Sequence, residues 1–352
     1  MNNLSQKVTM QPLVSVCLPN LRNRAYLPER IDSIVAQTWT DWELVVFDNY
    51  SDDGAWEYLC ERAATEPRMR VTQAPREGMY ANWNNCIRAA QGKYVYIATS
   101  DDNMAPDCLE KLVAALELHP ECGVAHTRLH VFGENYEAAQ AWWNADSMLA
   151  QSSGGRGVAT SHLRCAPLDG LLHTTGLTVV VSITQALIRR NVFDTVGYFP
   201  NDCGVVGDFA WHARCGWSIN SVYVADTWGG WRLHAAQATA LNPSSQAGKV
   251  WVNYQLYVRA VKSFLATKPE PKQVGLAKLS LRVAYAHAVH ASGRGQPFPV
   301  RMARLFWAIL RAGLALKLVS WGPKRLIRYL QTPAQFAVEE AARLRPDWIR
   351  PT

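Results

Sequence analysis

The first 130 residues alternate between short apolar runs rich in β-forming residues and segments with a helical spacing of apolar residues, and no other feature constrains the fold as strongly. We expect strands at 13–18, 42–47, 70–73, 93–99 and 123–132, and helices between them at 24–37, 55–64, 82–90 and 106–118. A repeat of about 30 residues per strand and helix is typical of doubly wound sheets. The sequence therefore predicts an α/β fold with a Rossmann-like, mostly parallel sheet flanked by helices.

Three of the expected strands end in polar residues, and these ends predict a ligand site. The polar ends are Pro19-Asn20, Asp48-Asn49 and Ser100-Asp101-Asp102. Ligands of doubly wound sheets bind outside the carboxyl ends of the strands. Mg²⁺ typically takes one or two carboxylates together with substrate phosphates, so Asp101 and Asp102 predict a metal–diphosphate site. The structural alternative is that Asp102 or Asp107 caps the helix starting near Pro106.

Two further carboxylates are candidates for a role in binding or chemistry. Asp48 follows a strand and can accept a hydrogen bond from the N–H of a pyrimidine or guanine base, although the residues after it also fit an Asx-rich turn. Asp208, in GVVGDFAWHARCGW, stands before a helical segment and is a candidate general base. An ordinary helix N-cap is the alternative for Asp208.

Two longer stretches carry a family resemblance. Residues 14–59, VSVCLPNLRNRAYLPERIDSIVAQTWTDWELVVFDNYSDDGAWEYL, resemble the start of inverting family-2 glycosyltransferases. Residues 76–112, REGMYANWNNCIRAAQGKYVYIATSDDNMAPDCLEKL, are similar to the second half of their donor site. The resemblance covers roughly residues 13–240, with several motifs in the expected order, and implies the nucleotide-sugar-binding GT-A fold.

The resemblance also implies roles for individual residues. The residues implied in nucleotide-sugar binding are Pro19, Asn20, Asp48, Arg76, Asn84, Ser100, Asp102 and Arg232. A divalent cation, Mn²⁺ or Mg²⁺, would be held by Asp101 with Asp102 and His234. Asp208 falls where the family places its catalytic base, and the segment Arg232-Leu233-His234 resembles the one that closes over the diphosphate. Thr99 stands where many relatives have the first aspartate of an Asp-x-Asp triplet, and Leu21 stands where they often have a tyrosine.

The rear of the chain is strongly basic. From Lys249 to the end there are 18 Lys and Arg against 4 Asp and Glu, a net charge of +14, whereas the first 248 residues hold 18 and 25, a net charge of −7. The segment from Arg301 to Trp321 carries basic and apolar residues at helical spacing and contains too many charges for a membrane span. We expect helices that bind an anionic membrane surface; helices packed on the catalytic domain are the alternative. No nucleic-acid motif accompanies the charge, so no nucleic-acid partner is expected.

The expected organisation is a flexible tail at 1–11, a catalytic domain at 12–248 and a basic helical region at 249–352. The tail is polar and lacks the apolar segment of a signal peptide, and the eight cysteines form no CxxC pair, which favours reduced thiols in the cytoplasm. We therefore expect a protein attached peripherally to the inner face of the membrane.

Taken together, the residues and the resemblance predict a metal-dependent inverting glycosyltransferase for hexosyl or deoxyhexosyl groups. The expected donor is a UDP-, dTDP- or GDP-sugar, and the expected acceptor is a glycan or lipid-linked glycan of bacterial surface polysaccharide, such as O-antigen. A nucleotidyltransferase is one rival, but it would want glycine in the loop PNLRNRAYL after the first strand, which has none. The other rival is a degenerate transferase that binds nucleotide at the membrane surface without catalysis.

Overall fold

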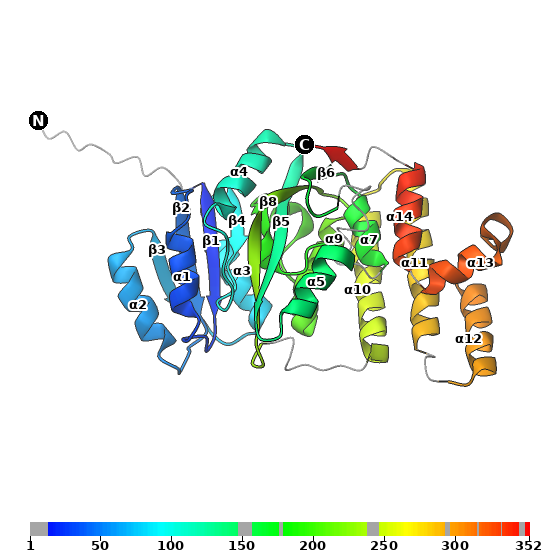
Figure 1. The fold of residues 1–352 in the computed structure, drawn as a ribbon, viewed down its shortest axis with the longest axis horizontal. Coiled ribbons are helices and arrows are strands. Elements are labelled where there is room, and N and C mark those ends of the chain that lie inside the picture. The colour runs from blue at the N-terminus through cyan, green and yellow to red at the C-terminus, as the bar shows by residue number, and fades with distance from the viewer. Residues whose placement is uncertain are drawn as a thin grey trace, which may run out of the picture.

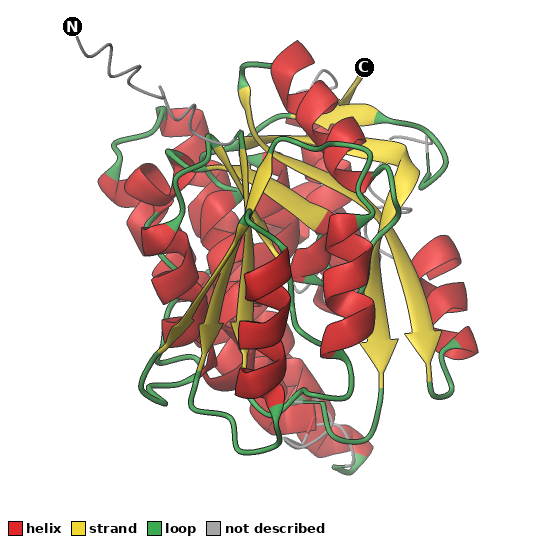
Figure 2. Cartoon of the chain, turned by 90° about the vertical axis from the view of Figure 1, so that its left-hand side faces the viewer, coloured by secondary structure: helices red, strands yellow, loops and turns green. Residues whose placement is uncertain are grey.

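One mixed sheet organises the chain. The computed structural model describes residues 13–146, 157–175, 179–237, 246–292, 296–314, 317–331, 333–344 and 349–352, so the expected tail at 1–11 lies outside the described residues. Within these ranges nine strands form the sheet, in the order β3-β2-β1-β4-β7-β5-β8-β6-β9, with helices on both faces (Figures 1 and 2). The expected α/β fold is confirmed.

The first four strands are parallel and give the sheet its Rossmann-like half. They are β1 (Val14–Asn20), β2 (Trp42–Asp48), β3 (Met69–Gln73) and β4 (Tyr94–Ile97). β1 lies between β2 and β4, and its last residue, Asn20, pairs in register with Asp48 at the end of β2. The carboxyl ends of β1, β2 and β4 therefore meet at one edge, as the sequence pattern predicts.

The helices of this half divide between the two faces of the sheet because the strand side chains alternate in direction. Val14, Val16 and Leu18 of β1 pack with α1 (Leu27–Val35), α2 (Ala55–Thr65) and α4 (Cys108–Leu118). Cys17 points the other way, into a core formed with α3 (Met79–Ala89), α8 (Val192–Val196) and α9 (Gly207–Cys215).

The remaining strands extend the sheet with both polarities. They are β5 (Cys122–Gly133), β6 (His162–Arg164), β7 (Ala186–Arg189), β8 (Asn220–Leu233) and β9 (Ile349–Pro351). β7 is antiparallel to both β4 and β5, and β8 is parallel to β5. The short elements between them are α5 (Glu137–Asp146), α7 (Leu168–Thr174) and the 3₁₀ turns η1 (Ile183–Gln185) and η2 (Gly204–Val206).

The described residues 179–190 differ from the sequence pattern of 175–190, which is apolar and β-rich and then helical. The structure has the reverse order, η1 and then β7. Ser182 and Gln185 cap the η1 turn through their side chains, and the residues after it fill the gap between β4 and β5. Pairing with distant strands therefore outweighs the local pattern.

The basic rear is helical, as predicted. It consists of α10 (Gln246–Ala266), α11 (Pro271–Ala291), α12 (Phe298–Arg311), α13 (Lys317–Gln331) and α14 (Pro333–Leu344). α10, α11, α13 and α14 contribute side chains to the core beside β5, α7 and α9, while α12 packs in a separate cluster with α11 and α13 at the end of the molecule farthest from α2 (Figure 1). β9 then returns to pair with β6, so the division at residue 248 stays a prediction.

Candidate functional site

A cavity of about 600 Å³ lies at the edge where β1, β2 and β4 end. Ligand pockets in proteins commonly have volumes of about 300–1,000 Å³. Six of the residues implicated from the sequence line it: Pro19, Asn20, Arg76, Ser100, Asp101 and His234. The cavity is also lined by Gly78, Met79, Asn82 and Trp83 of the α3 region, and by Leu21 and Thr99. The structure thus brings polar residues from the ends of β1, β2 and β4 together around one cavity, and ligand binding there stays a prediction.

Asp101 and His234 face each other in this cavity. The Oδ2 atom of Asp101 lies 3.0 Å from Nε2 of His234, although the two residues are 133 positions apart in the chain. The Asp101 side chain is 23% exposed and the His234 side chain 7% exposed. Nδ1 of His234 is buried and has no hydrogen-bond partner among the described residues. A carboxylate and an imidazole at hydrogen-bond distance form a pair that a divalent cation could bridge.

Asp102 does not line the cavity and is held by protein groups. Its Oδ1 accepts a hydrogen bond from the backbone N–H of Arg232 at 2.7 Å, and its Oδ2 accepts one from the Thr99 hydroxyl. Burial, followed by the neighbouring Asp101 carboxylate, raises the pKa of Asp102 to about 7. Asp102 therefore joins the end of β4 to the end of β8. Its expected role at the metal or the sugar stays a prediction.

Arg232 contacts the backbone of Asp101 beside the cavity. Its Nε donates to the carbonyl oxygen of Asp101 at 2.7 Å, and its guanidinium pairs with Glu29. The guanidinium carbon lies 5.1 Å from the ring centre of Tyr26 and 4.4 Å from that of Phe132, so the guanidinium also makes cation–π contacts with both rings. Arg232 does not line the cavity, and its expected contact with the leaving group stays a prediction.

Asp48 is fully buried and acts on its neighbours. Its Oδ1 accepts hydrogen bonds from Asn20 Nδ2 at 2.7 Å and Ser51 Oγ at 2.6 Å, and its Oδ2 accepts one from the Ser51 N–H at 2.8 Å. Asn20, by contrast, lines the cavity, and its Oδ1 has no partner among the described residues. Asp48 thus orients Asn20, whose free carbonyl is the better placed of the two to accept from a base N–H.

Arg76 and Asn84 show two different outcomes. Arg76 lines the cavity, and its Nε donates to the backbone oxygen of Asn49 at 2.8 Å, which fixes it beside the end of β2. Asn84 is buried in α3 and does not line the cavity. Its Nδ2 donates to the Phe199 oxygen at 2.8 Å, and its Oδ1 accepts from the Phe199 N–H at 3.0 Å. Asn84 clamps the segment before α9 and offers no free group to a donor.

Asp208 lies in the first turn of α9, is not among the residues that line the cavity, and is linked to α3 through Tyr80. Its Oδ1 accepts hydrogen bonds from the Tyr80 hydroxyl at 2.9 Å and from the Phe209 N–H at 2.8 Å. Tyr80 belongs to the same turn of α3 as the wall residues Met79 and Trp83. Burial raises the pKa of Asp208, while the two hydrogen bonds favour its charged form.

Sequence reasoning missed three residues that complete the site. Asn23 Nδ2 donates to Ser100 Oγ at 2.7 Å and so joins the loops after β1 and β4. Asn82 donates to the Phe47 oxygen at 2.8 Å at the end of β2, and Trp83 forms part of the wall. The spacing Asn20-x-x-Asn23 is a weak signal for the first residue. The helical pattern of α3 hides the other two among core residues.

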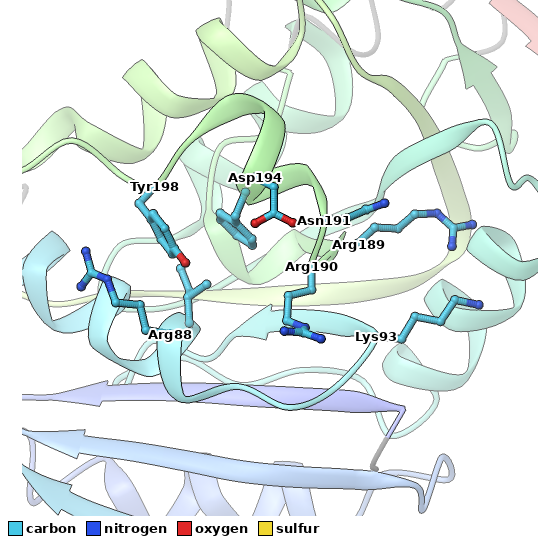
Figure 3. Close-up of a pocket in the computed structure, with 9 residues that line it drawn as sticks. Arg88, Lys93, Arg189, Arg190, Asn191, Asp194 and Tyr198 are labelled. Carbon is cyan, nitrogen blue, oxygen red and sulfur yellow. The ribbon is translucent and has the colours of Figure 1, made fainter. Parts of the chain in front are cut away.

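A second cavity, of about 330 Å³, lies at the opposite edge of the sheet (Figure 3). Lys93 directly precedes β4, so this cavity is at the amino end of the strand whose carboxyl end carries Asp101. Its basic lining residues are Arg88, Lys93, Arg189 and Arg190. Lys93 is paired with Glu117 at 2.6 Å, and Arg189 donates to the Cys122 oxygen at 2.7 Å. Arg190 Nε likewise donates to the Gly92 oxygen at 2.8 Å, and Arg88 donates to Asn85 Oδ1 at 3.3 Å, so all four of its positive groups are already engaged.

Metal-ligating side chains are sparse around the first cavity. Within the described ranges, no three His, Cys, Asp or Glu side chains come close enough together to hold a metal ion. The Asp101–His234 pair supplies two protein ligands, which fits a cation that takes its other ligands from a bound diphosphate and water. No helix in the described part of the chain is long and apolar enough to cross a membrane.

Comparison with known proteins places this geometry in a family. The model of the family described as glycosyl transferase family 2 matches residues 15–197, which is more than half of the chain. The chain is 34% identical over 125 residues to the putative glycosyltransferase EpsE of Bacillus subtilis, covering 35% of this chain and 45% of that protein. It is 32% identical over 102 residues to the putative teichuronic acid biosynthesis glycosyltransferase TuaG of the same species, covering 29% and 40%. These matches span less than half the length of either relative.

Structural similarity to a known protein covers more of the chain than sequence similarity does. The crystal structure of Staphylococcus aureus TarS residues 1–349 in complex with UDP-GlcNAc has a TM-score of 0.60 to this chain and is 15% identical; the alignment covers 94% of this chain and 91% of that TarS fragment. That likeness includes the helical region after residue 248 and bears on the fold alone.

Proposed function

This chain belongs to glycosyl transferase family 2, and on that premise we propose that it transfers a sugar from a nucleotide-diphosphate sugar to a hydroxyl group of a glycan, with inversion at the anomeric carbon. The expected donor is a UDP-, dTDP- or GDP-sugar carrying a hexosyl or deoxyhexosyl group. The observation that carries the proposal is the meeting of Asp101 and His234, 3.0 Å apart, in a cavity formed by the carboxyl ends of β1, β2 and β4. This is where ligands bind in sheets of this type.

Asp101 and His234 would hold Mn²⁺ or Mg²⁺, and both residues suit such a cation. Carboxylate oxygen is a preferred ligand of both metals, and neutral imidazole is the commonest metal ligand in proteins. When bound, the cation would supply positive charge to the diphosphate leaving group. Asp102 would take part as a buried anion behind Asp101, since its own oxygens are occupied by Thr99 and Arg232.

The nucleoside would lie over the ends of β1 and β2. Pro19, Asn20 and Arg76 form this part of the cavity, and Asn20 Oδ1 is free to accept a hydrogen bond. The Arg76 guanidinium brings a fixed positive charge close to the donor. The Ser100 hydroxyl, which accepts from Asn23, stands between this part and Asp101.

Asp208 would act as the general base. It would remove the proton of the acceptor hydroxyl as that oxygen forms a bond to the anomeric carbon and the bond to the diphosphate oxygen breaks. The Tyr80 hydroxyl and the Phe209 N–H both bind Oδ1, which leaves Oδ2 for the acceptor. Burial that raises the pKa of Asp208 makes its carboxylate a stronger base than an exposed one.

The acceptor is proposed to be a lipid-linked glycan of bacterial surface polysaccharide, of which O-antigen is one kind. The name of TuaG, a putative teichuronic acid biosynthesis glycosyltransferase, supports a transferase of this class. The enzyme would then work in the cytoplasm at the inner face of the membrane, which its basic helical region would contact.

The test is a screen for nucleotide release. Purified full-length protein is incubated with UDP-, dTDP- and GDP-sugars, each with Mn²⁺, with Mg²⁺ and with a chelator, and the free nucleoside diphosphate is measured. We expect release from one donor class, dependent on the metal and lost in Asp101→Ala. No release from any donor by the wild-type protein, with Asp101→Ala indistinguishable from it, would contradict the proposal.

A further inference from the structure

The outer face of α12 is apolar although it is exposed. Thirteen large hydrophobic residues are exposed in the described chain, and five of them lie in or beside this one helix: Val300, Met302, Phe306, Trp307 and Leu310. Met302, Phe306 and Leu310 are four residues apart and therefore form one stripe along the helix. Phe306 is 63% exposed and Trp307 54% exposed. The structure thus presents a continuous apolar surface that no described residue covers.

The opposite face of α12 is packed. Leu305, Ala308 and Ala312 are buried in a cluster with Ala286 of α11 and Leu326 of α13. The helix is therefore held in place through one side only, and its orientation does not depend on the exposed stripe. A ligand for that stripe would meet a preformed surface.

A basic groove borders the stripe. It has a volume of about 270 Å³ and lies between α11 and α12. Arg304, Trp307 and Arg311 line it from α12, at helical positions i, i+3 and i+7, and Tyr285 and Val289 line it from α11. Neither arginine forms an ion pair with any carboxylate in the described ranges. Two free guanidinium groups with a tryptophan between them suit an anionic group on an amphipathic molecule.

The charge around this surface is of one sign. Residues 271–338 contain eleven Lys and Arg and no Asp or Glu at all. The next carboxylate in the chain, Glu339, is already paired with Arg325 and Arg328 of α13. The positive field of α12 is therefore not compensated by its own neighbourhood.

We propose that α12 lies in the interface of an anionic membrane, with the stripe Met302–Phe306–Leu310 in the acyl boundary and Arg304 and Arg311 holding lipid phosphate groups in the groove. An exposed apolar stripe flanked by tryptophan and arginine is the pattern of helices that lie in the membrane plane. A second copy of the chain would bring the same arginines close together, and the like charges would repel. Nucleic acid would bind the arginines but would leave the apolar stripe exposed to water. The inference rests on the proposed function in one respect: a lipid-linked acceptor explains why the protein would bind a membrane.

The experiment is vesicle co-sedimentation of the full-length protein, with phosphatidylcholine vesicles containing or lacking phosphatidylglycerol. The charge variant is Arg304→Gln/Arg311→Gln, and its matched control is Arg88→Gln/Arg190→Gln, which removes the same charge from the cavity at the other edge of the sheet (Figure 3). The apolar variant is Phe306→Ser, matched by Leu118→Ser, an exposed leucine of α4. All four change exposed side chains, so circular dichroism should show the same fold.

We expect binding only to the anionic vesicles. Each basic residue near such a surface contributes enough for the charge variant to bind about 30-fold more weakly, and raising the salt to about 1 M should abolish binding. Phe306→Ser should weaken it about tenfold, and the two controls should bind like the wild type. Quenching of tryptophan fluorescence by brominated lipid should be reduced by Trp307→Phe.

Three results would overturn the inference. One is equal binding to neutral and anionic vesicles. Another is equal weakening by the Arg88/Arg190 control, which would mean that net charge rather than α12 is responsible. The last is the absence of vesicle binding together with a dimer that Phe306→Ser dissociates. Nucleotide release from the soluble donor is measured in the same preparations, so a failure of the membrane site is distinguished from a failure of the transferase site.

Discussion

Replacing Asp208 with asparagine separates its proposed chemical role from its structural one. Both hydrogen bonds of the side chain end on Oδ1, from Tyr80 at 2.9 Å and from the Phe209 N–H at 2.8 Å. Asparagine keeps an oxygen at that position and can accept both bonds. The substitution therefore removes the charge and the basic Oδ2 atom while preserving the contacts that position α9.

The size of the expected effect follows from these contacts. Removal of a positioned general base commonly slows a reaction by about 10²–10⁴-fold, which corresponds to roughly 3–5 kcal/mol of barrier. The free energy of unfolding should change by only about 1 kcal/mol, since the hydrogen bonds persist and a buried charge is lost. Binding of the nucleoside diphosphate should be unchanged because Asp208 does not line the cavity.

The assay compares single-turnover transfer from the donor found in the screen with calorimetric binding of its nucleoside diphosphate. The matched control is Asp202→Asn. Asp202 lies six residues before Asp208, and its exposed carboxylate pairs with Arg259. Tyr80→Phe should cause a smaller loss and move the acidic limb of the rate profile to higher pH, since Tyr80 lowers the pKa of Asp208. A rate for Asp208→Asn above about a tenth of the wild type, where a base loss should exceed 10²-fold, would refute the assignment.

Further predictions concern the support of the site. Asn84→Ala should lower the free energy of unfolding by about 2–3 kcal/mol in urea titrations, because it leaves the buried Phe199 N–H without a hydrogen-bond acceptor, and the KM for the sugar donor should change little. A large rise in that KM at unchanged stability would instead support a direct role of Asn84 in binding. Thr99→Val removes a donor to the Asp102 carboxylate, so it should raise the pKa of that group further and shift the acidic limb of kcat/KM upward, and an unshifted profile would contradict this. Burial lowers the pKa of His126, His173 and His212 to about 3, 4 and 3. Below about pH 6.5 the unfolded chain therefore binds more protons than the folded chain. The contribution of these histidines to the free energy of unfolding should be complete above that pH and should fall by about 1.4 kcal/mol per histidine at pH 5.5, which circular dichroism would detect as a lower Tm. A Tm that stays constant from pH 7.5 to 5.5 would show that these groups are not held neutral.

The sequence pattern was sufficient for the part of the fold in which neighbouring elements in the chain are neighbours in space. The strand–helix repeat up to β5 and the polar ends of β1, β2 and β4 follow from local periodicity and from the rule that ligands bind at such ends. Asp101 and His234 also appeared in one predicted site, but through the family resemblance. Nothing local in the sequence brings together residues 133 positions apart.

The rest depends on pairing between distant segments. β7 enters the sheet antiparallel between β4 and β5, and its sequence carries no signal for that position. Asp48 and Asn84 have side chains typical of binding sites, yet their hydrogen bonds are made by Ser51, Asn20 and the Phe199 backbone. The sequence alone does not show whether a buried polar residue hydrogen-bonds to a ligand or to another part of the chain.

The most direct test of the proposed donor site is a calorimetric titration of UDP, dTDP and GDP into the protein with and without Mn²⁺. We predict that one nucleotide binds tightly only with the metal, that Asp101→Ala and His234→Ala each abolish the metal dependence, and that the matched variant Asp107→Ala, an aspartate in the loop before α4, leaves it intact. Equal binding with and without Mn²⁺ by the wild type and by both site variants would contradict the assignment of Asp101 and His234 as the pair that holds the cation.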